Sequence, residues 1–229
     1  MKTIGIIGGM SWHSTSSYYR LINEGIQKKL GGLHSAKILL SSLDFAEIAV
    51  LQNKNQWDIA GELLASHALK LQQSGADFIV IATNTMHISV PQIEQAIHIP
   101  ILHIADATAD AIIKAGYKST GLLGTRFTMQ MEYYTSRLQN KSLAVLIPKS
   151  LDCQRINQVI FDELVFGKTI EKSKLDYLFI IESLKQKGAE CIIAGCTEIT
   201  LFIRQNDINL PLFDTTAIHA QAAVDLALQ

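Results

Sequence analysis

Apolar and polar positions alternate along the chain in blocks that predict strands and helices by turns. Short apolar runs such as Thr3–Ile7 and Lys37–Ser42 are typical of buried strands, whereas Trp57–Leu71 carries its apolar residues at helical spacing. Strand and helix blocks follow one another in this way to the end of the chain. Because alternating β and α units form parallel sheets with right-handed crossovers, the pattern predicts an α/β fold.

Glycine and proline set several limits of the expected elements. Gly31-Gly32 ends the first helix, Pro91 opens a short helix, and Pro100 precedes a strand. The polar segment Asp44–Asn55 is expected to be a loop. Outside the repeated segments described next, the expected strands are Thr3–Ile7, Lys37–Ser42, Ile101–Ile104, Leu143–Ile147 and Leu210–Phe213. The other expected helices begin at Ser11 or Ser14 and at Trp57, Asp106, Thr128, Asp152, Glu171, Thr197 and Thr215, of which the one at Thr197 is short.

One stretch of the chain occurs twice. Gly75-Ala-Asp-Phe-Ile-Val-Ile-Ala-Thr-Asn-Thr85 reappears as Gly188-Ala-Glu-Cys-Ile-Ile-Ala-Gly-Cys-Thr-Glu198, and a single shift of 113 positions aligns the two copies. Each copy consists of an acidic residue, a short apolar run and then a polar corner. This pattern predicts a fully buried strand with small hydroxyl, thiol and amide groups at its carboxyl end. In the alignment Thr83 falls on Cys196.

The duplication predicts two similar α/β domains. Lys118–Gly124 also echoes Lys2–Gly8, at a shift of 116, so the pattern restarts after about half of the chain. We expect an N-terminal domain of residues 1–113 together with 210–229 and a C-terminal domain of residues 114–209, each a parallel sheet flanked by helices. The last helix is expected to pack back on the first domain. The alternative is one continuous sheet in which the resemblance between the two stretches is accidental.

Composition narrows the class of partner. The chain has 229 residues, of which 48% are hydrophobic and 18% charged, as in an ordinary soluble protein with one large core or two smaller ones. A formal net charge of −1, with Lys and Arg not gathered into a basic stretch, argues against a nucleic-acid or membrane surface. A small molecule is the expected partner. The N-terminal apolar run is too brief for a signal or a spanning helix, so a cytoplasmic location is expected.

The cysteines and histidines give no sign of a metal site. Cys153, Cys191 and Cys196 are an odd number without CxxC spacing, which predicts neither a disulfide framework nor a zinc site. We expect Cys153 and Cys191 to be packing residues. No pair of histidines has metal-ligand spacing either. Three of them lie near strand ends or helix starts and are expected to be structural: His87, His103 and His219.

The polar corners after the strands are the expected binding site. In parallel sheets, ligands lie beyond the carboxyl ends of the strands, where helix N-termini present unpaired N–H groups. Those ends carry Gly8–Ser11, Thr83–Thr85, Gly124-Thr125 and Cys196–Glu198, which suit a small carboxylate. Dinucleotide or nucleoside triphosphate binding has no sequence support, because neither GxGxxG nor GxxxxGK[ST] occurs. A GxSxG elbow is also missing.

Thr83 and Cys196 are the candidates for chemistry. If the two halves face one another, these residues approach a shared cleft from opposite sides. A thiol has an ordinary pKa of about 8.5, which a helix N-terminus lowers, and Cys196 stands directly before Thr197-Glu198. Its thiolate can then act as nucleophile or general base, with Thr83 returning a proton from the other face. The alternative is that Cys196 is a buried core thiol, as most free cysteines are.

Four motifs carry a family resemblance that covers essentially the whole chain. In this order and spacing they resemble those of the aspartate/glutamate racemase family, whose members need no cofactor. The resemblance implies two pseudo-symmetric α/β domains with the active site in the cleft between them, often in a homodimer. It also implies racemisation by two opposed bases without pyridoxal phosphate. The motifs are Ile6-Ile-Gly-Gly-Met-Ser-Trp12 with Ser14-Thr15, Thr83-Asn-Thr-Met-His87, Gly121-Leu-Leu-Gly-Thr125 and Gly195-Cys-Thr-Glu198.

The chain departs from the family pattern at three places. Typical aspartate racemases have a cysteine where this chain has Thr83, an arginine where it has Leu51-Gln52, and a lysine where it has Phe166. The arginine and lysine normally hold the substrate's side-chain carboxylate, so their absence weakens the case for an acidic substrate. The Thr83 and Cys196 pair is similar to that of a subgroup described as L-aspartate/glutamate-specific racemases.

The expected function is inversion of the α-carbon of L-aspartate or L-glutamate between Cys196 and Thr83. Because a hydroxyl is far less acidic than a thiol, Thr83 is expected to be a poor base, which predicts faster catalysis from one enantiomer than from the other. One alternative is a broad-specificity racemase of neutral amino acids. Another is a non-catalytic small-carboxylate binding protein, and a third is a sister activity such as hydantoin racemisation, maleate isomerisation or decarboxylation of a malonate.

Six further residues are expected to bind the substrate. Asn84, Thr85 and Thr197, with their backbone N–H groups, are the natural cradle for the α-carboxylate, although helix capping explains the same residue types. The resemblance also places Met10 and Gln52 at the pocket, whereas on residue type alone Met10 is a core residue and Gln52 faces solvent. Thr125 is the sixth, by its position after the strand that echoes the first. Glu198 either tunes Cys196 or favours the N-terminus of its helix.

Overall fold

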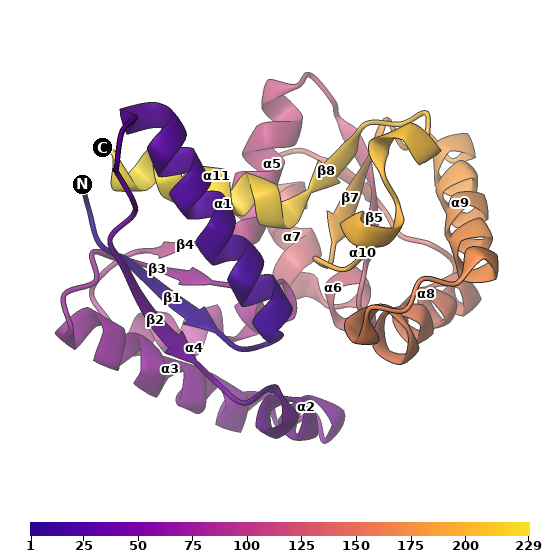
Figure 1. The fold of residues 1–229 in the computed structure, drawn as a ribbon. Helices are drawn as coiled ribbons and strands as arrows, with labels where there is room; N and C mark the ends of the chain where they lie inside the picture. The colour runs from indigo at the N-terminus through magenta and orange to yellow at the C-terminus, as the bar shows by residue number, and fades with distance from the viewer. The chain divides into compact units, whose positions relative to one another are not determined.

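The structure is a computed structural model that describes all 229 residues. The chain forms two compact units, each with one four-stranded sheet (Figure 1). All strand pairs are parallel, and the strand orders β2-β1-β3-β4 and β6-β5-β7-β8 are the same in the two sheets. The predicted α/β fold with two parallel sheets flanked by helices is therefore confirmed, and the single continuous sheet is excluded.

The first unit comprises residues 1–104 and 216–229. Its strands are buried where they run through the middle of the sheet, as β1 and β3 are along their whole length. The strands are β1 (Ile4–Gly8), β2 (Ile38–Ser42), β3 (Phe78–Ile81) and β4 (Ile101–Leu102), and the helices are α1 (Trp12–Leu30), α2 (Phe45–Asn53), α3 (Trp57–Gln73), the 3₁₀ helix η1 (Thr85–Ser89), α4 (Val90–Ala96) and α11 (Thr215–Ala227).

Two layers of helix cover the first sheet, because successive strand residues point to opposite faces. Ile4 and Ile6 of β1 pack with residues of α1 and α11. Ile7, Ile79 and Ile81 pack on the other face with residues of α2, α3 and α4. In Figure 1, α1 and α11 accordingly lie on one side of this sheet, and α3 and α4 on the other.

The second unit comprises residues 105–215. Its two central strands, β5 and β7, are buried almost throughout, and α6, α8 and α9 contact β5. The strands are β5 (Ser119–Gly124), β6 (Ala144–Leu146), β7 (Cys191–Gly195) and β8 (Leu212–Asp214), and the helices are α5 (Ile104–Lys114), α6 (Arg126–Gln130), α7 (Glu132–Asn140), α8 (Ser150–Asp162), η2 (Leu164–Phe166), α9 (Glu171–Gln186), α10 (Ile199–Phe202) and η3 (Gln205–Asp207).

The helix that follows the last strand of each sheet belongs to the other unit. α5 follows β4 but is part of the second unit, where Asp106 accepts a hydrogen bond from Arg137 at 2.6 Å. α11 follows β8 but packs in the first unit, as expected for the last helix. The unit limits consequently differ from the domain limits predicted above. β8 pairs with β7, so it lies in the second sheet and not with the first domain.

One predicted loop is a helix. The segment Asp44–Asn55 was expected to be irregular because of its polar residues, and α2 occupies most of it. Asp44 caps this helix, since its carboxylate accepts a hydrogen bond from the backbone N–H of Ala46 at 3.0 Å. Phe45 and Leu51 pack against the core cluster that contains the buried Ile48, and this apolar face stabilises the helix.

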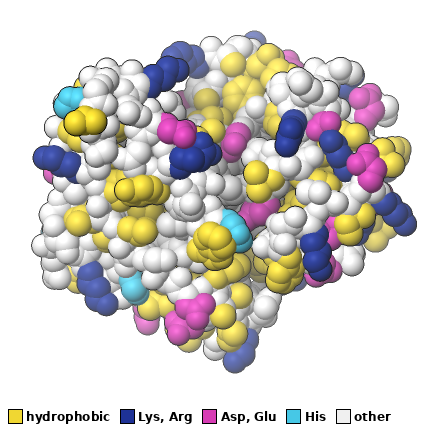
Figure 2. Space-filling model, in the orientation of Figure 1, with side chains coloured by type: hydrophobic (Ala, Val, Ile, Leu, Met, Phe, Trp, Pro, Cys, Tyr) yellow, Lys and Arg dark blue, Asp and Glu magenta, His cyan; other side chains and the backbone are white.

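None of the helices combines the length and the apolar character that crossing a bilayer requires. On the face shown in Figure 2, Lys and Arg side chains are dispersed among acidic and uncharged ones. This dispersion agrees with a formal net charge of −1.

Candidate functional site

Thr83 begins the polar corner that follows β3. The backbone N–H of Thr83 donates to the carbonyl of Ile81 at 2.9 Å, which turns the chain sharply out of the strand. Asn84 and Thr85 then enter the 3₁₀ helix η1 and are buried, whereas Thr83 is only partly buried. The side chain of Asn84 makes no capping hydrogen bond to this helix. Capping therefore does not account for the amide group at this position.

The turn after β1 supports the same corner. Gly9 has φ +89°, and a Cβ there would lie 2.0 Å from the carbonyl oxygen of Leu43, so only glycine fits. The hydroxyl of Thr15 accepts a hydrogen bond from the N–H of Gly9 at 2.8 Å. Ser14 donates its hydroxyl to the carbonyl of Ala82 at 2.8 Å, which joins the start of α1 to the residue before Thr83.

Met10 and Gln52 lie on the same side of the first unit. Both are buried, and Met10 belongs to the core cluster that also contains Met86. The Gln52 amide donates to the Met86 sulfur at 3.2 Å, so it reaches the residue next to Thr85. On residue type alone, Met10 was expected in the core, which is confirmed, and Gln52 was expected to face solvent, which is wrong. A glutamine of the last turn of α2 is drawn inward because the helix buries that face.

Three buried histidines lie behind the Thr83 corner: His87, His103 and His219. The ring centroids of His87 and His103 are 4.6 Å apart, and those of His87 and His219 are 5.6 Å apart. His219 makes hydrogen bonds of 2.8 Å with the Tyr18 hydroxyl and with the carbonyl of Leu102. Burial lowers the pKa of His219 to about 4. The structural role expected for these histidines is consistent with their contacts.

In the second unit, Thr125 and Cys196 leave neighbouring strands. Gly124 of β5 is paired with Gly195 of β7, so the two residues that follow emerge side by side at the same edge of the sheet. Thr125 caps α6, because its hydroxyl accepts a hydrogen bond from the N–H of Thr128 at 3.3 Å. Capping thus explains Thr125 at least in part, and its hydroxyl still stands at the carboxyl end of β5.

Cys196 is partly exposed, and its thiol donates a hydrogen bond to a carboxylate oxygen of Glu198 at 2.9 Å. Burial and then the charge of Glu198 raise the pKa of the thiol well above its ordinary value, against the opposing effect of the N–H groups of Thr197 and Glu198. The predicted lowering of this pKa is therefore wrong. α10 begins only at Ile199 and has four residues, so it offers little dipole, whereas the neighbouring carboxylate acts directly.

A charged network joins α8 and α9 in the second unit. Arg155 donates to Asp176 at 2.8 Å and to the Ser173 hydroxyl at 2.9 Å, and that hydroxyl donates to Glu163. Tyr177, on the same helix as Ser173, is buried, and its pKa is raised well above the ordinary value by burial and then by the charges of Cys196 and Glu163. No sequence signal marked Tyr177, which occupies an apolar position of α9.

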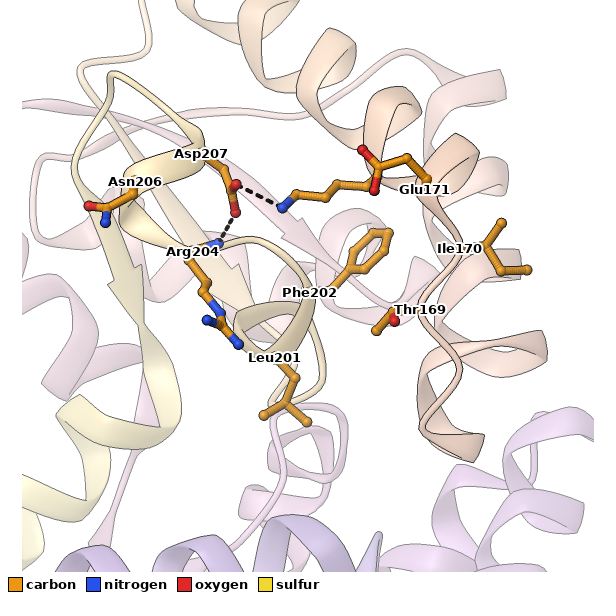
Figure 3. A pocket seen from close by; sticks show the side chains of 9 residues that line it. Thr169, Ile170, Glu171, Leu201, Phe202, Arg204, Asn206 and Asp207 are labelled. Carbon is orange, nitrogen blue, oxygen red and sulfur yellow. Dashed lines mark hydrogen bonds and ion pairs between the residues drawn. The ribbon is translucent and has the colours of Figure 1, made fainter.

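The largest hollow described in the second unit does not contain the predicted site residues. It has a volume of about 420 Å³ and lies where α9 begins, next to α10 and η3 (Figure 3). Lys174 and Asp207 form an ion pair of 2.7 Å along its wall, and Asp207 also accepts from the backbone N–H of Arg204. Because these charged groups already bind one another, the hollow is not the candidate site.

The predicted site residues thus form one group in each unit. Within the first unit, Met10, Gln52, Thr83, Asn84 and Thr85 belong to the carboxyl edge of the sheet and to the helices that follow it. Within the second unit, Thr125, Cys196 and Thr197 follow the paired strands β5 and β7. Three residues that contact these groups carried little weight in the sequence-based predictions: Ser14, His87 and Glu198. Their places within the four motifs were the available signal.

Comparisons with known proteins agree with this architecture. The sequence model of the family described as Asp/Glu/Hydantoin racemase matches residues 7–223. The chain is 26% identical, over 98% of both chains, to the broad specificity amino-acid racemase RacX of Bacillus subtilis. It resembles the crystal structure of a proposed Asp/Glu racemase from Yersinia pestis, with 50% identity, complete coverage of both chains and a TM-score of 0.95. It also resembles PH1733, an aspartate racemase homologue from Pyrococcus horikoshii, with 33% identity, complete coverage of both chains and a TM-score of 0.87.

Fold and motifs together define a doubled α/β protein with a polar corner at the same place in each sheet. The extent of the match is decisive for the family, since it covers almost the whole chain. The chain belongs to the Asp/Glu/hydantoin racemase family. The predicted family is confirmed, and so, at the level of the family, is the predicted enzyme class, an isomerase of the amino-acid racemase type.

Proposed function

We propose that this protein is a cofactor-independent racemase that inverts the α-carbon of L-aspartate or L-glutamate, with Cys196 and Thr83 as the proton-transferring pair. The observation that carries the proposal is the equivalence of the two corners. Thr83 follows β3 and Cys196 follows β7, the third strand in each of two sheets with the same strand order. Two different proton-transferring groups at equivalent places suit a reaction that needs one group on each face of a carbon atom.

The first step is removal of the α-proton by the Cys196 thiolate. Because burial and Glu198 raise the pKa of the thiol, it carries its proton at neutral pH in the free protein. The thiolate therefore has to form in the complex, where the thiol proton passes to the Glu198 carboxylate to which it is hydrogen-bonded. The positively charged ammonium group of an amino acid favours this thiolate. Breaking the C–H bond transfers the proton to sulfur and leaves the electron pair on the substrate, delocalised into its α-carboxylate.

The second step is delivery of a proton to the opposite face by the Thr83 hydroxyl. The electron pair forms the new C–H bond, and the Thr83 alkoxide recovers a proton through solvent from the Cys196 thiol, which restores the thiolate. When the product leaves, the proton held by Glu198 returns to Cys196, and the enzyme is back in its starting state. Because a hydroxyl gives up its proton far less readily than a thiol, the two directions differ in rate. We propose that catalysis is fast from one enantiomer and slow from the other.

Three residues hold the α-carboxylate in the proposed complex. The N–H groups of Asn84, Thr85 and Thr197 stand at the carboxyl ends of parallel strands, where anions bind. The same N–H groups stabilise the charge that the carboxylate gains when the α-proton leaves. Met10, Gln52 and Thr125 complete the proposed substrate-binding set.

Exchange of the α-hydrogen in deuterated water tests the proposal. Each enantiomer of aspartate and glutamate is incubated with the protein, and deuterium incorporation and chirality are followed by mass spectrometry and chiral chromatography. We expect inversion by the wild type and its loss in Cys196→Ser, since a serine hydroxyl is a much weaker base at this pH. Cys153→Ser is the matched control, because Cys153 is also a free thiol but lies buried on α8.

Equal α-hydrogen exchange from the two enantiomers would contradict the proposed difference in proton transfer between Cys196 and Thr83. Absence of inversion in the wild type, with retained binding of a small carboxylate measured by calorimetry, would instead support a binding protein on the same fold. The latter outcome also rules out the proton-transfer roles of Cys196 and Thr83.

A broad-specificity racemase is the second candidate function, and one observation favours it. Where aspartate racemases are expected to carry a cationic side chain, this chain has the neutral, buried Gln52 and the 70% exposed Phe166. The relative RacX is named a broad specificity amino-acid racemase. Testing a panel of neutral and acidic amino acids separates the candidates, because turnover of neutral side chains at rates similar to those of aspartate favours broad specificity.

We also propose that the protein acts as a homodimer, as the family resemblance implies. Light scattering coupled to size-exclusion chromatography measures the mass in solution. A mass equal to that of one chain at micromolar concentration would rule the dimer out.

A further inference from the structure

His87 makes a hydrogen bond directly to the residue proposed to return the proton. It lies on η1, four residues after Thr83, and is 1% exposed. Its Nδ1 is 2.8 Å from the carbonyl oxygen of Thr83, and its Nε2 is 3.2 Å from the backbone nitrogen of Ile104. The imidazole therefore connects the end of β3 to the residue at which α5 begins.

The two contacts fix the tautomer of His87. A backbone N–H only donates, so Nε2 accepts the hydrogen bond from Ile104 and carries no proton. A carbonyl oxygen only accepts, so Nδ1 carries the proton and donates it to Thr83. His219 has the opposite tautomer, because its Nε2 donates to the carbonyl of Leu102. The two rings are neighbours with different orientations of their N–H groups.

The carbonyl of Thr83 controls more than its own residue. The peptide group is planar, so the direction of the Thr83 carbonyl also sets the direction of the Asn84 N–H, which points to the opposite side. That N–H belongs to the proposed carboxylate cradle. The hydrogen bond from Ser14 to the carbonyl of Ala82, and the one from the Thr83 N–H to Ile81, fix the preceding peptide groups. His87 supplies the corresponding restraint for the peptide group after Thr83.

We propose that His87 is a positioning residue for proton return: its Nδ1–H holds the Thr83–Asn84 peptide group so that the Thr83 hydroxyl and the Asn84 N–H face the substrate together. The inference rests on the proposed racemase function. It requires a hydrogen bond from the Nδ1–H of His87 to the carbonyl of Thr83. A histidine that only filled space would not need this bond.

The equivalent position in the second unit makes a different contact. The shift of 113 that aligns the repeated stretches places Thr200 at the position of His87. The Thr200 hydroxyl donates to the carbonyl of Thr197 at 3.0 Å, one residue beyond Cys196. The carbonyl of Cys196 itself accepts from the backbone N–H of Ile199 at 3.1 Å. At the position equivalent to His87, the side chain thus holds the carbonyl of Thr197 and not that of Cys196.

Two substitutions test the roles of Nδ1 and Nε2 of His87 one at a time. In His87→Asn, the side-chain amide nitrogen takes the place of Nδ1 and can still donate to Thr83. In His87→Gln, the longer side chain reaches the place of Nε2, where its oxygen accepts from Ile104 and nothing donates to Thr83. We expect kcat in the direction that Thr83 serves to fall by about 10²-fold in His87→Gln, because a small misplacement of a reacting group has costs of this size, and by much less in His87→Asn.

His219→Gln is the matched control, since its amide nitrogen keeps the bond to the Leu102 carbonyl while the cluster loses an imidazole. This variant is expected to lose stability without a selective loss of proton return. Circular dichroism melting of all three variants shows whether each is folded. Equal kcat values in His87→Asn and His87→Gln, with both folded, would overturn the proposal.

A measurement on the wild type covers the case in which the variants do not fold. Nitrogen-15 NMR of histidine-labelled protein reports which ring nitrogen of His87 is protonated. We expect the Nδ1–H tautomer, with and without aspartate. An Nε2–H tautomer or a doubly protonated ring would refute the proposal even if the protein racemises amino acids. A wild type that inverts no amino acid would instead remove the proposed function, which keeps the two failures distinct.

Discussion

The two units share a strand order but differ in what surrounds their polar corners. Behind Thr83 lies a buried cluster of imidazoles, in which His87 hydrogen-bonds the Thr83 backbone. Beside Cys196 lies the carboxylate of Glu198, which hydrogen-bonds the side chain. The contact in the first unit therefore acts on the backbone of the hydroxyl residue, and the contact in the second acts on the thiol itself. Duplication supplied the framework, and the residues around each corner made the halves chemically unequal.

Removing the thiol is the strongest way to break this comparison. We expect Cys196→Ser to lower racemisation by about 10³-fold, because it removes the general base of the proposed reaction. Thr83→Ala should cost less, since a water molecule at that place can still supply a proton. Steady-state rates from both enantiomers measure the two effects. Equal losses in the two variants would show that the corners contribute alike.

Making the two corners alike sharpens the comparison. Thr83→Cys places a thiol in both units, and a thiol is a better proton donor and base than a hydroxyl. We expect the slow direction to become about 10-fold faster, with a smaller change in the fast direction. The ratio of deuterium incorporation from the two enantiomers should move toward one. An unchanged ratio would mean that Thr83 does not limit the slow direction.

Replacing Glu198 by a neutral residue tests whether its carboxylate affects the protonation of the Cys196 thiol. Glu198 raises the pKa of Cys196, so Glu198→Gln should lower this pKa and produce thiolate at lower pH. The rate of alkylation by iodoacetamide as a function of pH reports thiolate formation. We expect several-fold faster alkylation of the variant at neutral pH. The exposed acid Glu190 offers a control, because it hydrogen-bonds the backbone of Lys118 and Ser119 instead of the thiol. Slower alkylation of Glu198→Gln would contradict the assignment.

The histidine cluster should make the first unit sensitive to acid. The pKa of His219 is 6.5 in the ordinary case and about 4 in the folded protein. As pH falls below 6.5, the unfolded chain binds a proton at His219 that the folded protein refuses until about pH 4. The contribution of His219 to the free energy of unfolding is therefore fully present above pH 6.5. It is lost as the pH falls from 6.5 to about 4, and the loss is on the order of 3 kcal/mol.

Urea unfolding of the wild type and of His219→Gln at neutral and acidic pH measures this loss. The variant should show a smaller difference in unfolding free energy between the two conditions. Hydrogen exchange should show that opening begins in the first unit, which alone contains the cluster. An identical pH dependence in the two proteins would exclude His219 as the cause.

Much of the fold could be predicted because the sequence repeats itself. The shift that aligns Thr83 with Cys196 also places both residues after buried strands, and the structure has β3 and β7 there. α2 was missed because Asp44 and the polar run Gln52–Asn55 at the two ends of the segment suggested a loop, although Asp44 and the apolar residues after it were available signals. The limits of the units depend on which helix packs on which sheet, and local patterns do not specify this.

The site was predicted less completely than the fold. Residue types and motif order indicated Thr83 and Cys196, but the protonation of Cys196 depends on where the Glu198 carboxylate points. The spacing of two residues between Cys196 and Glu198 permits this hydrogen bond but does not require it. Likewise, the sequence shows a histidine at position 87, whereas its tautomer follows from partners at Thr83 and Ile104, which only the folded chain brings together.

The exchange of helices between the units has a consequence for protein synthesis. α11 supplies Ala220, Ala223 and Val224 to the core that contains Tyr18 and Ile22, although two hundred residues of chain separate them. While the ribosome is still translating, the N-terminal half of the nascent chain presents an apolar face that nothing in it covers. The unit that is made first is therefore the one that matures last, when the C-terminal helix emerges from the exit tunnel.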